Sequence, residues 1–459
     1  MSDWTDEEFG DVHLGDQRLN RRLRRLLLRK WENPQRSLSA GCQGRAEVEA
    51  ASRFFDNPKA HLDKILAPHR AATLARIRLG GYRRVLLVQD TSEGDYTTHP
   101  ALQGAGPLSS QDRRGFFIHN LLVVTPERVP LGLWHTFIYA RDDAEHGKAA
   151  TRKERPIEQK ESFRWIEGYR EACALAGLLP ACEVLCLADR ECDIYELFVE
   201  YDQRCAQGLP VAELLIRSNQ DRCLEPFEAE AATAAGSVPP PPAPKKIRAR
   251  LAAATVLGHV AFDVPAATRL KKTKGKCPKP VHRSARHVEQ EVRAVPIRLK
   301  PPWRSPAVGG ALPAVELWVV EARDQPPAGE EPLVWVLLTT LPVATSAQAV
   351  ELLELYLCRW EIVAVAPHAQ ERLPRRGNPA ALRLPVRAGD RVVSDRRLAA
   401  ALCPAPGPRV PQPAVRRALR GMRMEAGGGR AQRPRGAPVS ALRRRNGEYD
   451  RATGRSPRA

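Results

Sequence analysis

The chain has 459 residues, with 72 Lys and Arg against 53 Asp and Glu and a formal net charge of +19, a length typical of about two or three structural units. No apolar run approaches the roughly 20 residues that cross a bilayer, and the opening residues MSDWTDEEFG are acidic, so we expect neither a membrane span nor a secretory signal. The 10 cysteines are scattered without a CxxC pair, which argues against a zinc module and favours reduced thiols.

A basic amphipathic helix is predicted over residues 15–31. Leucines at 19, 23, 26 and 27 share one face, and arginines occupy the remaining surface. Two further helices are predicted over about 45–55 and 60–78. Together they form a small helical unit over residues 1–78. The arginines fit a solvated helix face and a DNA-contacting face about equally well.

The sequence after Gly81 changes to short β-branched runs. VLLVQD ending at Asp90, FFIHNLLVV from Phe116 and LGLWHTFIYA from Leu131 predict an antiparallel meander of three strands. A helix over about 157–178, a buried strand over 183–188, a helix from Ile194 and the strand AELLIRSN follow. This order is that of a ribonuclease H-like α/β domain. We therefore expect the catalytic core to span residues 79–363.

A long interruption separates the strand AELLIRSN from the end of this core. Residues of about 220–333 contain the linker SVPPPPAPKK, a Lys-rich loop and the extended runs HVEQEVRAVPIRL and AVELWVVEA, which predict an inserted β-rich subdomain. The strand LVWVLLTT and the helix SAQAVELLELYLCRWEI then return to the core pattern. Coherent periodicity stops near Ile362.

Two carboxylates are singled out by their placement. Asp90 ends the first predicted strand and Asp189 ends the fourth, and these strands are neighbours in the ribonuclease H order. Asp side chains brought together in this way can hold Mg²⁺, and two such ions clamp the attacking and leaving oxygens of phosphoryl transfer. A single Asp at a strand end is more often a turn residue, but two at matching places favour a metal site.

Several motifs resemble one known family. In their order along the chain they resemble DDE transposases of the insertion-sequence-four type, most closely the Tn-five-like group, from about Gly15 to Ile362. The stretches that carry this resemblance are LGDQRL, SRFFDNP, LLVQDTSEGDY, LGLWHTFIYARDD, KESFRW, LCLADRECDIYEL, LIRSN, LVWVLLTTLPV and YLCRWEI. It implies a bacterial, cytoplasmic and nucleoid-associated enzyme that binds the ends of a mobile element, cuts them with bound Mg²⁺ and joins them to target DNA.

The resemblance also assigns roles to individual residues. Asp90 and Asp189 correspond to the first two members of the catalytic triad, which holds two Mg²⁺ ions in the intact family. Trp335 resembles the aromatic residue that receives a flipped base, with a core Trp as the alternative. The remaining positions implied to contact double-stranded DNA are Arg18, Arg21, Arg22, Arg217, Tyr356 and Arg359.

The third carboxylate of the triad is missing. The family signature runs Tyr, two residues, Arg, three residues, Glu, six residues, Lys. Tyr356 and Arg359 fit it, but Val363 stands at the Glu position and Gln370 at the Lys position. Glu361 lies about 200° around the helix from the required position, so we expect it to face away from the aspartates.

Composition changes abruptly at the same point. Residues 364–459 contain 22 Arg, no Lys and six acidic residues, whereas residues 1–363 have 50 basic against 47 acidic residues, a net charge of +3. The last segment has no Phe, Trp or Ile, so we expect a basic, unstructured tail. Residues 367–377 can be back-translated so that another frame yields the Leu-Lys-Ser-Gly peptide usual around the signature Lys. We infer a frameshift at or just before Val363, with a natural tail as the alternative.

The sequence therefore predicts a transposase that is catalytically impaired. Two other functions stay open: a non-catalytic DNA-binding or inhibitory remnant, and a ribonuclease H-like nuclease without transposition. The family's dimerisation region would lie beyond the break at Val363. We therefore do not expect the paired-end homodimer of the family.

Overall fold

The computed structural model describes residues 4–362 apart from 35, 100–101, 111, 144–154, 228–243, 265, 274–275, 305–309 and 328–329, and also 384–386 and 391–393. The helices are α1 (Trp4–Phe9), α2 (Gln17–Glu32), α3 (Leu38–Gly41), α4 (Arg45–Phe55), α5 (Leu62–Gly80), α6 (Phe163–Leu178), α7 (Tyr195–Ala206), α9 (Ile247–Ala252) and α10 (Ser346–Leu357), with 3₁₀ turns η3 (Ile157–Gln159), η4 (Arg190–Cys192) and η6 (Cys358–Trp360). The strands are β1 (Arg84–Asp95), β2 (Gly106–Pro107), β3 (Arg114–Val124), β4 (Pro130–Tyr139), β5 (Glu183–Ala188), β6 (Glu213–Arg217), β7 (Leu224–Glu225), β8 (Gly258–Val264), β9 (Ala267–Thr273), β10 (Lys276–Arg283), β11 (Arg286–Leu299), β12 (Val315–Asp324), β13 (Val334–Thr339), β14 (Leu384–Val386) and β15 (Arg391–Val393).

The N-terminal part is helical, as the sequence predicts. Helices α2, α4 and α5 correspond to the three expected helices, and the short α1 and α3 are additions that no periodicity indicated. Apolar side chains of these helices, such as Leu26, Phe54 and Leu66, form one buried cluster that also includes Phe116 and Leu133 of the sheet. The helices therefore share a core with β3 and β4 and do not form an isolated unit.

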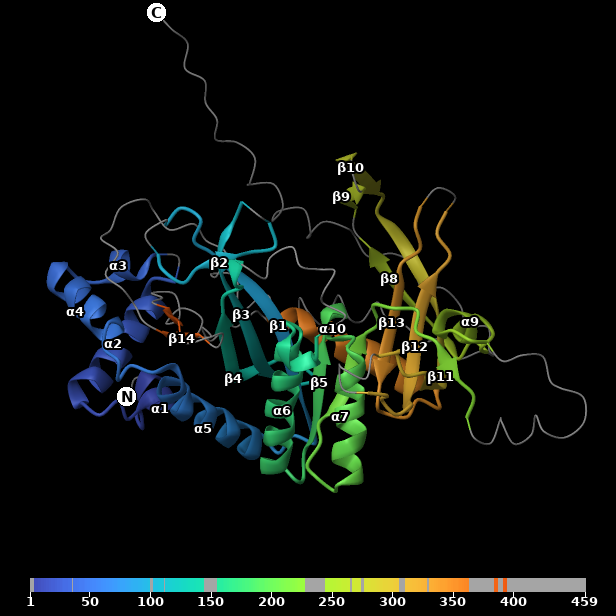
Figure 1. The fold of residues 1–459 in the computed structure, drawn as a ribbon, viewed down its shortest axis with the longest axis horizontal. Coiled ribbons are helices and arrows are strands. Elements are labelled where there is room, and N and C mark those ends of the chain that lie inside the picture. Colours follow the sequence, from blue (N-terminus) through green and yellow to red (C-terminus); the bar gives the residue numbers. More distant parts are fainter. Residues whose placement is uncertain are drawn as a thin grey trace, which may run out of the picture. The chain divides into compact units, whose positions relative to one another are not determined.

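One eleven-stranded mixed sheet organises the rest of the described chain (Figure 1). Strands β4, β3 and β1 form the predicted antiparallel meander, and β5 and β6 continue it in parallel with β1. The runs in β1, β3 and β5 are almost continuously apolar because both faces of these strands are covered. The predicted mixed α/β class is confirmed.

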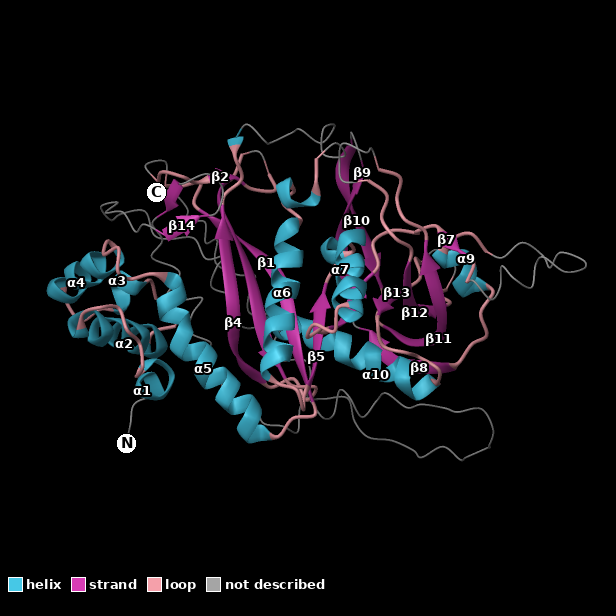
Figure 2. Ribbon diagram, turned by 60° about the horizontal axis from the view of Figure 1, so that its bottom comes forward, coloured by secondary structure: helices cyan, strands magenta, loops and turns pink. Residues whose placement is uncertain are grey.

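Helices cover both faces of this sheet. Side chains of α6 and α7, among them Trp165 and Phe198, pack on one face, where Figures 1 and 2 show both helices lying across the strands. Residues of α10, among them Leu352 and Tyr356, pack on the opposite face against Leu86, Val88 and their neighbours. Successive side chains of a strand point to opposite faces of the sheet, so they contribute alternately to these two clusters.

The strands of residues 220–333 do not form a sheet apart from the core. Strand β13 pairs with β6, and β12 and β11 continue the same sheet beyond β13. The expected insertion is β-rich, but it lengthens the main sheet. Only the hairpin of β9 and β10 forms a separate ladder among its described residues.

Two boundaries differ from the sequence-based ones. Helix α6 begins at Phe163, after the separate turn η3, and not near residue 157. Of the tail predicted to be unstructured, residues 364–459, the structure describes β14 and β15, which pair with each other, and the remainder lies outside the described residues. Among the described helices, none combines the length and the apolar character needed to cross a membrane.

Candidate functional site

The two predicted carboxylates lie next to each other in the sheet. Strands β1 and β5 run parallel, and the last paired residues are Val88 and Leu187, so Asp90 and Asp189 each follow two residues later. The expectation that Asp90 ends its strand was wrong. Strand β1 continues to Asp95 because β3 still pairs with it, with Asn120 opposite Asp90, after β5 has stopped at Ala188.

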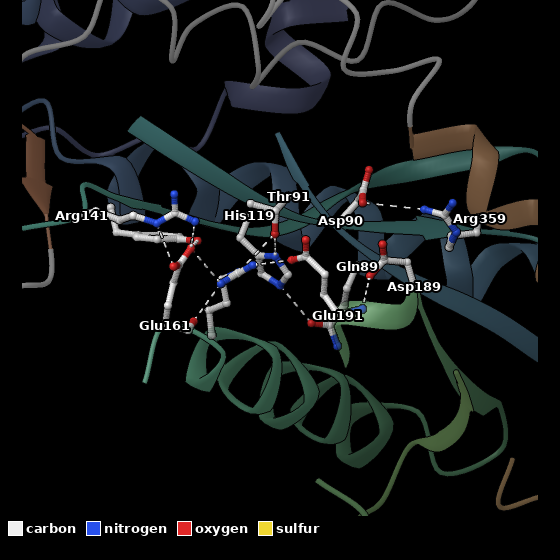
Figure 3. Close-up of polar contacts among 11 residues, drawn as sticks. Gln89, Asp90, Thr91, His119, Arg141, Glu161, Asp189, Glu191 and Arg359 are labelled. Carbon is white, nitrogen blue, oxygen red and sulfur yellow. Dashed lines mark hydrogen bonds and ion pairs between the residues drawn. The ribbon is translucent and has the colours of Figure 1, made fainter. Parts of the chain in front are cut away.

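Asp90 is partly buried and electrostatically unfavourable as a carboxylate. Its side chain is 24% exposed, and Arg359 is its ion-pair partner, with Nη1 3.7 Å from Oδ1 (Figure 3). The pKa of Asp90 is raised to about 6 as the net result of several effects. Burial raises it most, the positive charge of Arg359 lowers it, and the negative charge of Asp189 raises it. The two aspartates therefore repel each other across adjacent strands.

Asp189 is held by the local backbone. It caps the turn η4, and its Oδ1 accepts a hydrogen bond of 2.8 Å from the amide of Glu191. Glu191 itself is paired with Arg164, whose Nη2 lies 2.7 Å from Oε2. The turn thus places Asp189 near Asp90, and the negative charge of Glu191, although paired with Arg164, also acts on Asp90.

Two adjacent carboxylates fit the ligand preference of Mg²⁺, which binds one or two carboxylates and completes its shell with water and substrate phosphate. Burial is the main cause of the raised pKa of Asp90, and the negative charge of Asp189 adds to it, so a bound cation would relieve this repulsion. In the described part of the chain, however, no group of three or more His, Cys, Asp or Glu is arranged to hold a metal ion. Val363 and Gln370 lie outside that part.

Four predicted DNA-contacting residues gather on the face of the sheet that carries Asp90. Arg217 ends β6 and is half-buried. Burial lowers its pKa, and the groups whose charge also affects it are Tyr356, Arg190, Arg359 and Asp189. Trp335 on β13 is half-buried, and its ring meets that of Tyr356 edge-on at 6.0 Å. Both predicted alternatives for Trp335 fit in part, because one side packs in the core and the rest is accessible.

Glu361 lies apart from this group, as the helical spacing predicts. Burial raises its pKa, and the charge that acts on it is that of Arg128, not of the aspartates. The Glu361 carboxylate therefore does not join Asp90 and Asp189.

The basic helix predicted over residues 15–31 is α2. Asp16 caps it by accepting the amide of Arg18 at 2.8 Å, and Leu23, Leu26 and Leu27 are buried. Arg18 and Arg21 are exposed and Arg22 is half-buried on the opposite side. This confirms the amphipathic pattern.

Other arginines of α2 have structural partners. Arg24 pairs with Asp6, and Arg29 lies between Glu32 and Glu47. Among the described residues, Arg21 and Arg22 form no ion pair, and Arg18 has only Asp16 at 3.4 Å. Arg18, Arg21 and Arg22 are therefore available for an external anion, as is Arg25, which is 62% exposed and has only Glu47 at 3.8 Å.

The family model described as Transposase DNA-binding matches residues 1–60. The matched region contains α1 to α4 and therefore the exposed arginines of α2. The N-terminal part of the chain is thus a transposase DNA-binding domain, and DNA is its partner.

Sequence reasoning missed the polar side chains beneath the aspartates. Gln89 and His119 are fully buried in strands that are otherwise apolar, and they hydrogen-bond to each other. A signal for them existed, because a Gln within VLLVQD and a His within FFIHNLLVV interrupt runs whose other members face a core.

Proposed function

We propose that this chain is a DNA transposase of the DDE type with a ribonuclease H-like core, whose N-terminal domain binds the ends of a mobile element. The observation that carries the proposal is the matching position of Asp90 and Asp189, each two residues beyond the last pair of the parallel strands β1 and β5, in a chain whose residues 1–60 match a transposase DNA-binding domain. The strand order β4, β3, β1, β5, β6 and the helices between these strands support the same fold.

The site would act on phosphodiesters. Asp90 and Asp189 would hold Mg²⁺, which when bound supplies an activated nucleophile and neutralises charge on the leaving oxygen. Arg217 and Arg359 would orient the DNA phosphate, since a guanidinium offers several donors to its oxygens. The half-buried Trp335 would give an unstacked base a surface to lie against, with the buried Tyr356 packed edge-on beside it.

We also propose that cleavage by this chain is strongly impaired. The third carboxylate of the triad is replaced by Val363, and a site with one metal ligand fewer binds its metal less tightly and misplaces the nucleophile. The change of composition after residue 363 supports translation out of frame. Sequencing the coding DNA across codons 355–380 tests this directly: a frame that encodes Glu at 363 and Leu-Lys-Ser-Gly downstream supports the frameshift.

A second candidate function is DNA binding without cleavage. It is favoured by the absence of a three-membered metal-binding group among the described residues. In this role the chain would occupy element ends and inhibit intact copies of the transposase.

One experiment separates these functions. The full chain is mixed with duplexes from the DNA on either side of its gene and with shuffled duplexes, and binding and nicking are measured with Mg²⁺ or Mn²⁺. The transposase proposal predicts salt-sensitive preference for one flanking sequence and slow nicking that Asp90→Asn abolishes. Preferential binding without any nicking favours the second function. Equal binding of shuffled DNA contradicts both, and unselective cleavage points to a general nuclease.

A further inference from the structure

A series of hydrogen-bonded polar groups, fully buried at Gln89 and His119 and exposed at Glu191, runs beneath the two aspartates, on the opposite face of the sheet. Since side chains alternate along β1, Asp90 points to the α10 side while Gln89 and Thr91 point to the α6 side. His119 on β3 lies between these two residues. Its Nδ1 is 2.8 Å from the Thr91 hydroxyl, and its Nε2 is 3.0 Å from Gln89 Oε1.

The hydrogen bonds fix a direction along this series. The Gln89 amide donates to Cys186 Sγ at 3.0 Å, so its Oε1 is left to accept from His119 Nε2. His119 Nδ1 then accepts from the Thr91 hydroxyl. The Thr91 oxygen in turn accepts from Arg164 Nε at 3.2 Å, and Arg164 Nη2 reaches Glu191. Burial lowers the pKa of His119 well below its usual value, which keeps the ring neutral, as this pattern requires.

The two ends of this hydrogen-bonded series lie on the two elements that flank Asp189. Cys186 belongs to β5, and Glu191 belongs to the turn that Asp189 caps. The middle of the series holds the residues on each side of Asp90. The polar groups therefore join the Asp90 segment to the Asp189 segment at two points, one before and one after the carboxylates.

Packing confines the same groups. The Trp165 ring meets His119 edge-on at 4.6 Å. Helix α6 passes so close that a Cβ on Gly168 would lie 2.1 Å from Gln89 Oε1. Any side chain at 168 must therefore displace Gln89, so the glycine and the polar series are matched to each other.

We infer that the hydrogen-bonded series Cys186, Gln89, His119, Thr91, Arg164 and Glu191 is a positioning device that sets the separation of the Asp90 and Asp189 carboxylates for a divalent cation. This rests on the proposed function, because it takes the two aspartates as metal ligands. None of the positioning residues is assigned to touch metal or DNA. Their action resembles that of the groups behind metal ligands in general, whose loss weakens metal affinity by about 10- to 100-fold.

Thr91→Val tests this inference because it removes the central hydroxyl and keeps the side-chain shape. Thr73→Val is the matched control. The Thr73 hydroxyl is also buried, donates to the carbonyl of His69 and accepts from Arg76 Nη2 at 3.1 Å, but it lies in α5. Affinity for Mn²⁺ is read from the electron paramagnetic resonance of the free ion, with the full chain, and thermal unfolding is followed in parallel.

We expect Thr91→Val to weaken Mn²⁺ binding at least 10-fold, Thr91→Ser to restore it, and Thr73→Val to lower thermal stability without changing Mn²⁺ affinity. Gly168→Ala should also weaken Mn²⁺ binding, because the added methyl group on α6 displaces Gln89. This effect is expected even though Ala has a higher helix propensity than Gly. Wild-type Mn²⁺ affinity in Thr91→Val would overturn the inference, because the hydroxyl would then serve stability alone.

A separate readout keeps the two proposals distinguishable. The proposed metal chemistry is wrong if the unaltered chain does not bind Mn²⁺, or if it binds Mn²⁺ and Asp90→Asn does not abolish the binding. Amide hydrogen exchange of the segments around Asp90 and Asp189 then decides the positioning role. Faster exchange in both segments for Thr91→Val, but not for Thr73→Val, supports it, and unchanged exchange contradicts it.

Discussion

The guanidinium of Arg359 lies 3.7 Å from the carboxylate of Asp90, although the two residues are 269 positions apart in the sequence (359 − 90). Arg359 is 7% exposed, and its Nε has no hydrogen-bond partner among the described residues. The turn η6 therefore places a buried positive charge beside Asp90, with the guanidinium also 4.4 Å from the centre of the Trp360 ring. This charge offsets only part of the cost of burying Asp90 next to Asp189.

Asp90→Asn should stabilise the protein at neutral pH. The pKa of Asp90 is about 6 in the fold against an ordinary value of 3.8, so the unfolded chain loses this proton first as pH rises. Stability therefore falls between about pH 4 and pH 6, by up to about 3 kcal/mol for two pKa units. We expect thermal unfolding of Asp90→Asn to shift upward at pH 7 and to match the unaltered chain at pH 4.

Asp95→Asn provides a control of opposite sign. Burial raises the pKa of Asp95, but hydrogen bonds from Thr97 and Arg113 outweigh it and lower the pKa to about 2. This carboxylate stabilises the fold above pH 4, and the benefit is lost as pH falls toward 2. Its replacement should lower the unfolding temperature at pH 7, and equal shifts for both variants would contradict the assignment.

Simultaneous replacement of Arg18, Arg21 and Arg22 by Ala should weaken DNA binding without unfolding the domain. These residues have few or no ion-pair partners in the described part of the chain, so their loss costs little stability. If each neutralises one phosphate, the slope of log K against log salt should become less negative by about 3. Fluorescence anisotropy at several salt concentrations measures this slope.

Arg45→Ala with Arg53→Ala is the matched control for the α2 variant. Both arginines are exposed on α4 within the same family-matched region, and both pair with Glu49. We expect the slope to change less than in the α2 variant. An equal change would mean that net charge, and not the α2 face, determines affinity.

Tyr356→Phe should leave stability unchanged or raise it by about 1 kcal/mol. The Tyr356 hydroxyl is buried and finds no hydrogen-bond partner among the described residues, so its removal relieves a desolvation cost. If the hydroxyl contacts DNA, the same variant should bind element ends more weakly. Denaturant unfolding and DNA titration on one sample test both effects, and a large loss of stability would show that the hydroxyl has a partner in the fold.

Glu8→Gln should destabilise the contact between the N-terminal helices and the sheet. Glu8 accepts from His69 Nδ1 at 2.7 Å and also pairs with Arg76, while His69 Nε2 accepts the amide of Leu133 on β4 at 3.0 Å. Burial raises the pKa of Glu8, but these partners outweigh it and lower the pKa overall. The stabilisation is present above about pH 4.5 and is lost in acid.

We expect Glu8→Gln to cost about 2 kcal/mol at pH 7 and less at pH 3, measured by denaturant unfolding. Exposed Glu49→Gln on α4 serves as the control and should change little. A cost for Glu8→Gln that is the same at both pH values would contradict a role for the ionised carboxylate.

Val363→Glu alone should not restore Mg²⁺-dependent strand transfer. The substitution returns one carboxylate, but Gln370 still stands at the Lys position and the sequence between them is not that of the signature helix. A gel assay with labelled element ends measures strand transfer. Activity of this single variant would show that the downstream sequence is dispensable.

The sequence predicts the layout of the sheet well where strands are apolar and helices are periodic. The parallel neighbours β1 and β5 follow from the strand order, and so does the meeting of Asp90 with Asp189. The end of β1 was misjudged because TSEGD has the polar residues of a turn. Pairing with β3 supplies the backbone hydrogen bonds that keep this segment extended, and local sequence carries no sign of that partner.

Contacts between distant segments are the part of the site that sequence alone could not give. Arg359 was expected to contact DNA, but its proximity to Asp90 depends on how α10 packs across the sheet. The pairing of Arg164 with Glu191 likewise joins a helix to a turn. Each of these ion pairs forms because tertiary packing brings distant residues together, so it cannot be predicted from the residue pattern or the spacing.

The pairing of β6 with β13 has a consequence for synthesis of the chain. Strand β6 ends at Arg217, and its partner opposite Arg217 is Leu337, so all residues between them must be made before this edge is closed. An emerging chain therefore carries the unpaired, apolar edge of β6 while the ribosome translates the intervening segment. Any product that stops inside that segment would keep this edge open and would be prone to associate with other unfinished chains.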